Sequence, residues 1–442
     1  MTNDKKSSVA DVPVHESTPD QDTHSTASNG RMLASGSGNL LMEALGKPRS
    51  NGELARALSY LPPKIDVSGL AHHERLHLVS VVRDLHLPSP AGVAVARQID
   101  LMLREGYRHR SPTSAKGWQS IYSLSSPSLA DQITMAPAMV GSPLAAAVVG
   151  VSGVGKTASI EKALTLYPQC VEHDSFPQMA RGHKQLVWLK VEVPGTGKAL
   201  DLARELWTAT DIALGTDYSA QKPVTTAKSG TVLLNLWLRR VACHYLGFMS
   251  LDEIQNLFNI GTLAQRRSAK VATQRPRVRI VDDEALKFIL TLINVAKIPI
   301  MVSGTHDAME IFETRMSTSQ RLTIEGLIRF EHAQTPDDDY FHDILLPAFF
   351  QHQFLDQKAS CSPQWRALMH RYTAGLPRLC ANLWIHSQRL ALNSNAKCID
   401  FRHVEQVMAT TMSPCIRGVD ALLSDGLGGT RNMRICGMTS NQ

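Results

Sequence analysis

The sequence has no long hydrophobic run: nothing in it approaches the roughly 18–20 consecutive apolar residues that a membrane-spanning helix needs. We therefore expect neither an integral membrane protein nor a membrane partner. The first residues include lysines but no apolar core behind them, so a secretory signal is not expected. The seven cysteines are scattered from Cys170 to Cys436 without a CxxC pair, which argues against a disulfide framework or a cysteine zinc site and favours a reducing cytoplasm.

A large excess of charge of one sign is also missing. The chain has 46 Lys and Arg against 40 Asp and Glu, a formal net charge of +6. This mild basicity permits a nucleic-acid partner but does not require one. With 442 residues, 43% of them hydrophobic, and about 150 residues per domain, the chain is long enough for two or three domains with ample cores.

Composition and periodicity divide the chain into five predicted parts. Residues 1–38 are poor in aliphatic residues and predict a disordered leader. Apolar residues at helical spacing predict a small helical adaptor at 39–130. Apolar strands alternating with helices predict an α/β domain at 131–335. A helical region at 336–420 and a flexible tail at 421–442 follow.

Within the α/β domain, short apolar runs are separated by helix-length segments such as Ala199–Leu214 and Asp283–Ala296. This alternation predicts a parallel sheet with crossover helices. The expected strands are Leu144–Gly150, Leu186–Val191, Tyr245–Leu251 and Ile298–Ser303.

The first of these strands ends in a complete GxxxxGK[ST] pattern, from Gly150 to Thr157. Its glycines allow backbone N–H groups to surround phosphates, Lys156 reaches the β- and γ-phosphate oxygens, and the Thr157 hydroxyl ligates magnesium. The pattern predicts ATP and Mg²⁺ as cofactors. The expected nucleotide contacts are Gly150, Val151, Ser152, Gly153, Val154, Gly155, Lys156, Thr157 and Ala158.

A second apolar strand ends in an acidic pair, Asp252 and Glu253. Asp252 is expected to bind the magnesium ion, and Glu253 to act as the general base for the attacking water. Such a pair often only caps a helix, but its combination with the phosphate loop favours catalysis. The sequence therefore predicts an ATPase.

Two further polar positions are candidates for contacts with the nucleotide. Thr305, with Ser303 as the alternate, follows the strand that ends near residue 303 and could orient the lytic water. The other interpretation is an ordinary turn leaving the strand. Arg378, after Gly375 and Pro377, is predicted in the first turn of a helix, where it could contact the γ-phosphate. Its alternative is a solvated arginine.

Together these residues resemble AAA+ ATPases, and more narrowly the TnsC/TniB transposition regulators, over about Glu74 to Val407. The resemblance implies a parallel-sheet P-loop fold with a helical lid and an N-terminal adaptor. It also implies an ATP-dependent ring or helical filament on target DNA, linking a target-selector protein to the transposase. The segments that carry it are Arg104–Tyr107, Gly150–Thr157, Leu166–Gln169, Trp188–Lys190, Leu214–Tyr218, Leu251–Asn256, Ile298–Thr305 and Gly375–Arg378.

Two segments depart from that family. The arginine-rich segment expected to supply a finger for a neighbouring subunit is thinned, and Arg321 and Arg315 are the candidates. The stretch after Asn256 is longer and more basic than expected, and phosphate contacts there would be independent of DNA sequence. A merely solvated charge run is the alternative. Its candidate DNA contacts are Arg266, Arg267, Lys270, Arg275, Arg277 and Arg279.

The sequence thus predicts a cytoplasmic, DNA-associated bacterial ATPase that acts as a switch. A helicase loader or origin-binding ATPase would share the core and the lid. A signalling NTPase that serves as a protein scaffold without DNA is a rival from a different class. Assembly on duplex DNA that depends on nucleotide would separate the first hypothesis from both.

Overall fold

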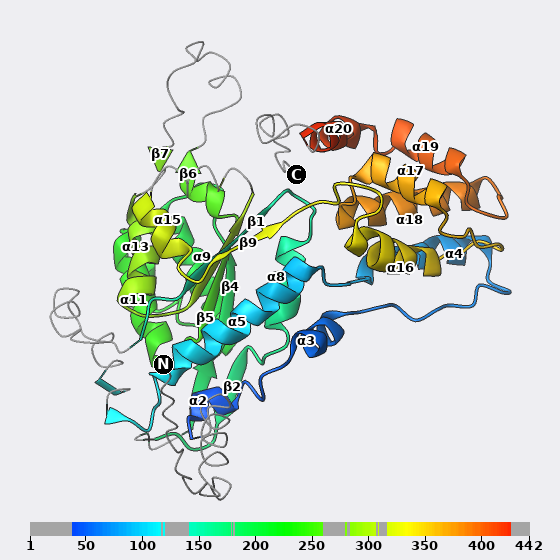
Figure 1. Ribbon diagram of the computed structural model, residues 1–442. Helices are drawn as coiled ribbons and strands as arrows, with labels where there is room; N and C mark the ends of the chain where they lie inside the picture. Colours follow the sequence, from blue (N-terminus) through cyan, green and yellow to red (C-terminus); the bar gives the residue numbers. More distant parts are fainter. Residues whose placement is uncertain are drawn as a thin grey trace, which may run out of the picture.

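A five-stranded parallel sheet forms the centre of the protein in the computed structural model (Figure 1). The described residues are 38–115, 118–119, 141–177, 179, 182–259, 279–280, 283–305, 308 and 316–425. The strand order is β4-β5-β8-β1-β9. All neighbouring strands are parallel, so they are joined by crossover connections rather than by hairpins. The strands are β1 (Ala145–Gly150), β4 (Trp188–Glu192), β5 (Phe248–Asp252), β8 (Ile300–Gly304) and β9 (Leu327–Phe330).

Both faces of this sheet are buried, which is why its strands are continuously apolar in sequence rather than alternating. On β1, Ala145, Ala147 and Val149 belong to one core, and Ala146 and Val148 belong to the other. One face is covered by helices α9 (Ala199–Leu214), α11 (Gly230–Cys243) and α13 (Asp283–Asn294), and the other by α5 (Pro90–Arg108) and α8 (Lys156–Leu164).

The expected strands differ from the observed ones in two places. The run Leu186–Val191 is divided between β4 and the end of an antiparallel hairpin, β2 (Cys170–His173) with β3 (His183–Leu186). The edge strand β9 was not predicted, because Leu327–Phe330 is short and contains an exposed arginine. It pairs with β1, from Ala147 opposite Leu327 to Gly150 opposite Phe330. A second two-stranded pair, β6 (Phe258–Asn259) with β7 (Arg279–Ile280), follows β5 and the short helix η2 (Ile254–Leu257).

The lid, predicted at 336–420, is helical throughout its described elements. Its core holds Phe350, Trp365 and Trp384, whose rings pack against one another. Its last helix continues to Asp425, past the predicted start of the tail. The lid elements are η3 (Tyr340–Leu345), α16 (Leu346–Gln351), α17 (Pro363–Thr373), α18 (Pro377–Asn393), α19 (Phe401–Ala409), η4 (Ser413–Cys415) and α20 (Ile416–Asp425).

The helices of the predicted N-terminal adaptor are shared between two cores. The first helices, α2 (Leu40–Glu43) and α3 (Asn51–Leu58), pack with α5 in the core beneath the sheet. Residues 59–87, which we call the strap, contain α4 (His72–Leu78) and η1 (Val79–Asp84) and pack on the lid. Val79 and Val82 are buried in the lid core. The chain therefore passes from core to lid and back before the sheet begins.

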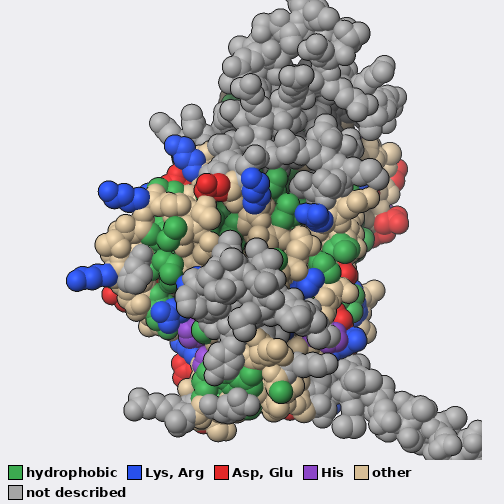
Figure 2. Space-filling model, turned by 90° about the vertical axis from the view of Figure 1, so that its left-hand side faces the viewer, with side chains coloured by type: hydrophobic (Ala, Val, Ile, Leu, Met, Phe, Trp, Pro, Cys, Tyr) green, Lys and Arg blue, Asp and Glu red, His purple; other side chains and the backbone are tan. Residues whose placement is uncertain are grey.

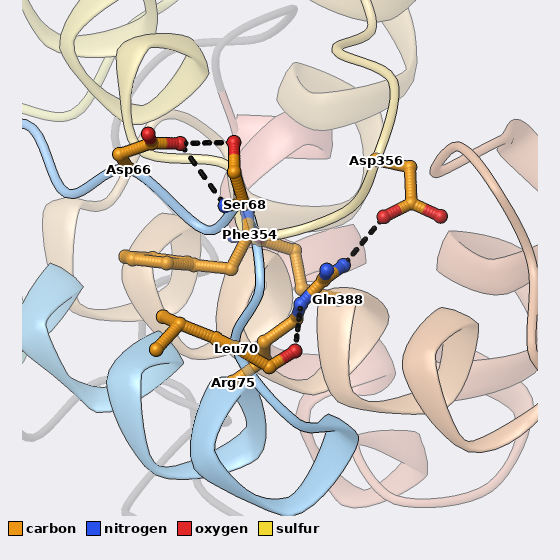
Figure 3. A network of polar contacts seen from close by, with 7 residues as sticks. All are labelled: Asp66, Ser68, Leu70, Arg75, Phe354, Asp356 and Gln388. Atoms are coloured by element: carbon orange, nitrogen blue, oxygen red, sulfur yellow. Dashed lines mark hydrogen bonds and ion pairs between the residues drawn. The ribbon is translucent and has the colours of Figure 1, made fainter.

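Polar contacts fix the strap to the lid (Figure 3). Arg75 of α4 donates to the Asp356 carboxylate at 2.6 Å and to the Leu70 carbonyl at 3.2 Å. Within the lid, the backbone N–H of Phe354 donates to the Gln388 amide oxygen at 3.0 Å. The strap is also closed on itself, because Tyr60 and His86 at its two ends form a β-bridge.

Two findings concern the membrane-spanning helix and the disulfide framework that the sequence argues against. None of the described helices is both long and apolar enough to cross a membrane. The six cysteines in the described part of the chain, from Cys170 to Cys415, are free thiols. The predicted leader up to residue 37 and the predicted tail from residue 426 lie outside the described residues.

Candidate nucleotide-binding site

The phosphate loop connects β1 to α8, at the edge of the sheet where the parallel strands end. Gly153 and Gly155 have φ of +86° and +106°, a region that favours glycine. Gly150 is required for a different reason: a Cβ there would lie 2.5 Å from the Phe330 carbonyl oxygen of β9. The close approach of β9 therefore leaves no room for a side chain at Gly150.

Lys156 begins α8 and is nearly buried, with 9% of its surface exposed. Its Nζ donates to the carbonyl oxygens of Gly150 at 2.8 Å and Val151 at 3.1 Å. Burial lowers the pKa of Lys156, while the nearby carboxylates of Asp252 and Glu253 raise it. The ammonium group thus lies inside the loop, as predicted, with both acidic residues close enough to affect it.

The Asp252 carboxylate at the end of β5 is buried and accepts three hydrogen bonds. Thr157 Oγ1 donates to Oδ2 at 2.7 Å. Ser303 Oγ of β8 and the backbone N–H of Glu253 donate to Oδ1, at 2.6 Å and 2.9 Å. Residues 95 positions apart in the sequence, Thr157 and Asp252, are therefore in direct contact.

Glu253 has a left-handed backbone, with φ of +55°, which is uncommon for a residue other than glycine. The carboxylate is half-buried and accepts a hydrogen bond from the Gln255 amide. Burial raises the pKa of Glu253, and the Asp252 charge adds to this effect. A carboxylate with a raised pKa is a better proton acceptor, which suits a general base.

Of the two candidates at the end of β8, Ser303 is the residue that contacts Asp252. It is fully buried, and parallel pairing places it opposite Val148 of β1. Thr305 lies two residues further on and is half-buried. Its backbone N–H donates to the Gln255 side-chain oxygen at 3.3 Å. Sequence alone leaves both positions open, because which hydroxyl reaches the carboxylate depends on where β8 ends.

Arg378 brings the lid into contact with the phosphate loop. It lies in the first turn of α18, and its backbone N–H is 3.4 Å from the Gly153 carbonyl oxygen. A Cβ on Gly153 would lie 3.4 Å from the Arg378 Cβ. Its charge also contributes to lowering the pKa of Lys156. The side chain is exposed, and the residue lies in the first turn of a helix, where the sequence predicted it.

The remaining candidates are not brought to this site by any described contact. Arg321 is exposed on α15 (Met316–Leu322), and Arg315 lies outside the described residues. Among the candidate DNA contacts, only the backbone of Arg279 is described, in β7, where it pairs with Asn259. Arg266, Arg267, Lys270, Arg275 and Arg277 lie outside the described residues.

Residues 141–312, which contain the loop, the acidic pair and β8, match a family model described as an AAA domain. The α/β core is an AAA domain. Its fold is that of an AAA+ P-loop NTPase, with a parallel five-stranded sheet and flanking helices. An AAA domain implies nucleotide binding and an ATPase activity in general. No curated protein matches the chain.

The residues present fit a nucleotide with magnesium. Mg²⁺ prefers oxygen ligands and is usually held by one or two carboxylates together with substrate phosphates. Thr157 and Asp252 supply a hydroxyl and a carboxylate oxygen 2.7 Å apart, and these two residues would hold the ion. When bound, the ion would neutralise phosphate charge.

Proposed function

We propose that the protein is an ATP-dependent regulator of DNA transposition. In this proposal it assembles on target DNA and connects a target-selector protein to the transposase, and ATP hydrolysis drives disassembly. The observation that carries the ATP-dependent part is that Thr157, next to the phosphate loop, and Ser303 both donate to the buried Asp252 carboxylate at the end of β5. This contact joins the three sequence elements that a P-loop ATPase needs.

Each residue of the proposed site has a separate task. The loop backbone and Lys156 hold the phosphates, and Thr157 with Asp252 holds the magnesium ion. Ser303 orients Asp252 through its 2.6 Å hydrogen bond. Glu253 accepts the proton of the attacking water.

The contact between Arg378 and the phosphate loop supports a switch. A lid residue beside Gly153 can bind the γ-phosphate of ATP and cannot do so with ADP. Nucleotide state then changes the free energy of one lid position relative to another, which a ligand-driven switch requires.

The DNA-binding part of the proposal rests on the basic stretch after Asn256. β6 and β7 pair at the two ends of residues 260–278, so the stretch leaves and re-enters the fold at neighbouring positions. Along the chain, β6 follows η2, and η2 follows the acidic pair. On the face seen in Figure 2, the described Lys and Arg side chains are scattered among hydrophobic and other side chains.

The transposition part of the proposal rests on the motif resemblance, above all Leu166–Gln169 and Leu251–Asn256. Both segments have structural roles near the site. The Tyr167 hydroxyl donates to Asp100 at 2.7 Å, and the Asn256 amide donates to the Val193 carbonyl at 2.8 Å. The first contact ties α5 to the segment after α8, and the second ties η2 to the end of β4.

Electron microscopy of the full chain with duplex DNA tests this proposal. With ATP and Mg²⁺ we expect rings or helical filaments on the DNA, and with ADP or no nucleotide we expect none. The cognate transposase, when added, should then shorten the lifetime of the ATP-bound assembly or attach to its end. Assembly only in the presence of a replicative helicase would indicate a loader. Nucleotide-dependent assembly that ignores DNA would indicate a protein scaffold.

A further inference from the structure

The side chain of Gln255 lies between the proposed general base and the end of β8. Gln255 belongs to η2, immediately after the acidic pair, and is half-buried. Its Nε2 donates to Glu253 Oε2, and its Oε1 accepts the backbone N–H of Thr305 at 3.3 Å. Both ends of one amide are thus used, and they connect Glu253 to Thr305.

These two partners fix which way the amide faces. A carboxylate can only accept, and a backbone N–H can only donate. Turning the amide over would place its oxygen against the Glu253 carboxylate and its NH₂ group against the Thr305 N–H, which loses both hydrogen bonds. The amide of Gln255 therefore has one satisfied orientation.

The backbone at the end of β8 lies close to the Gln255 side chain. A Cβ on Gly304, the last residue of β8, would lie 2.7 Å from Gln255 Oε1. Gly304 is not in the left-handed region, so a side chain there would act through the crowding of Gln255, with Ala308 and Ile254 at 3.0 Å, rather than through backbone strain. The neighbouring Asn256 donates to the Val193 carbonyl of the β4 end, which holds η2 in place.

The contact also affects the charge of Glu253. Burial and Asp252 raise the pKa of Glu253, whereas the hydrogen bond from Gln255 and the charge of Lys156 lower it. Glu192, at the end of β4, adds a further charge that raises this pKa. The Gln255 amide thus orients the carboxylate through their hydrogen bond.

We propose that Gln255 is a positioning residue for ATP hydrolysis, which holds the Glu253 carboxylate in place and ties its orientation to the residue that follows β8. The proposal rests on the general-base role proposed for Glu253. A displacement of Thr305 breaks the contact with Gln255 Oε1 and frees the amide to release Glu253. The rate of hydrolysis then depends on the position of the segment after β8.

The test compares Gln255→Met with wild type in the full chain, measuring kcat and KM for ATP hydrolysis. Methionine has a similar length but makes neither hydrogen bond. We expect kcat to fall at least tenfold while KM changes by less than about twofold, since a positioning group acts on the transition state.

Two further variants separate this role from simple packing. Gly304→Ala keeps the amide but pushes Gln255 Oε1, so it should lower kcat by a smaller factor, again with KM nearly unchanged. Gln221→Met makes the same substitution at an exposed position before α10 (Lys222–Thr225) and should leave kcat and KM at their wild-type values. A Gln255→Met enzyme with wild-type kcat, or one whose loss lies wholly in KM, overturns the inference.

The Glu253→Gln variant, assayed in parallel, tells the two proposals apart. If Glu253→Gln is inactive and Gln255→Met resembles wild type, the general base stands and the positioning role is wrong. If Glu253→Gln hydrolyses ATP at a near-normal rate, the general-base assignment is wrong, and the role of Gln255 falls with it.

Discussion

Lys156 places an ammonium group inside the phosphate loop, where it donates to the carbonyl oxygens of Gly150 and Val151. We expect Lys156→Ala to abolish ATP binding, because the group that faces the phosphates is lost. The fold should persist, because both of these partners belong to the loop itself. A titration with a fluorescent ATP analogue measures the first effect, and thermal melting measures the second. The exposed Lys162→Ala on the same helix is the matched control and should bind ATP normally.

Glu253 should affect stability in a pH-dependent way. Its raised pKa means that the folded chain holds the proton more tightly than the unfolded chain does. Its contribution to stability is therefore complete below the ordinary glutamate pKa of 4.5 and is lost as pH rises through the folded pKa. We expect Glu253→Gln to melt at a higher temperature than wild type at pH 8, and at the same temperature near pH 4.

Melting curves of both proteins across this pH range, without nucleotide, provide the measurement. The exposed Glu205→Gln on α9 is the control, and its difference from wild type should not depend on pH in this way. In the ATPase assay, Glu253→Gln should lower turnover by about two orders of magnitude or more, the range for removing a general base. A melting difference that grows toward low pH would contradict the expected sign.

At the level of elements, the turn between α17 and α18 determines where Arg378 lies. Gly375 has φ of +67°, and a Cβ there would lie 2.5 Å from the Ala333 Cβ. We expect Gly375→Ala to destabilise the lid by about 1–3 kcal/mol from overpacking, beyond the cost of the backbone conformation. Urea unfolding measures the loss, and ATP affinity should weaken as the start of α18 shifts.

Gly215 offers a matched control for this prediction. Its φ of +65° is nearly the same, but a Cβ there would meet nothing within 4 Å. Gly215→Ala therefore incurs the cost of the left-handed backbone alone. Equal destabilisation by the two substitutions would mean that the approach of Ala333 does not matter.

Elements with strong local signals can be predicted well. The bounds of α9 match the predicted Ala199–Leu214, because this segment has a continuous helical periodicity and ends at Gly215. The strand β9 escapes prediction because its place in the sheet comes from pairing with β1, which no local pattern in Leu327–Phe330 encodes. The packing of the strap on the lid was not predicted for a similar reason. The periodicity of α4 predicts a helix but does not show which core the helix joins.

Some residues of the site could likewise be predicted from the sequence, and others could not. Lys156, Thr157, Asp252 and Arg378 follow from motifs, and the structure places all four around one loop. The contact of Ser303 with Asp252 depends on the register of β8 with its neighbours. Gln255 stands out in the sequence only as part of a family segment, since nothing in its position shows that its amide reaches both Glu253 and Thr305.

At the level of the whole molecule, the proposed DNA path makes a prediction about salt. Each phosphate contact on duplex DNA releases about 0.9 counterion, so log affinity falls linearly with log salt concentration. Replacing Arg266, Arg267 and Lys270 with Ala should weaken binding to every duplex alike and flatten the slope by up to about three units. Fluorescence anisotropy over a range of salt concentrations measures both.

A triple variant that removes the same charge elsewhere controls for the change in net charge. Arg204, Lys222 and Lys228 are exposed and lie on or near α9 and α11. Their replacement with Ala should leave the salt slope close to that of wild type. A loss confined to one DNA sequence would instead indicate base readout, and equal slopes for all three proteins would assign DNA binding to other residues.

The links between core and lid come together at one place. The two ends of the strap are bridged through Tyr60 and His86, and the Tyr340 hydroxyl at the start of the lid donates to the Leu87 carbonyl at 2.7 Å. The three chain crossings are therefore linked to one another by hydrogen bonds, while Arg378 contacts Gly153 from the lid. Because the strap shares the lid core, we expect a nucleotide-dependent shift of the lid to carry residues 59–87 with it, a segment that precedes the phosphate loop in the sequence.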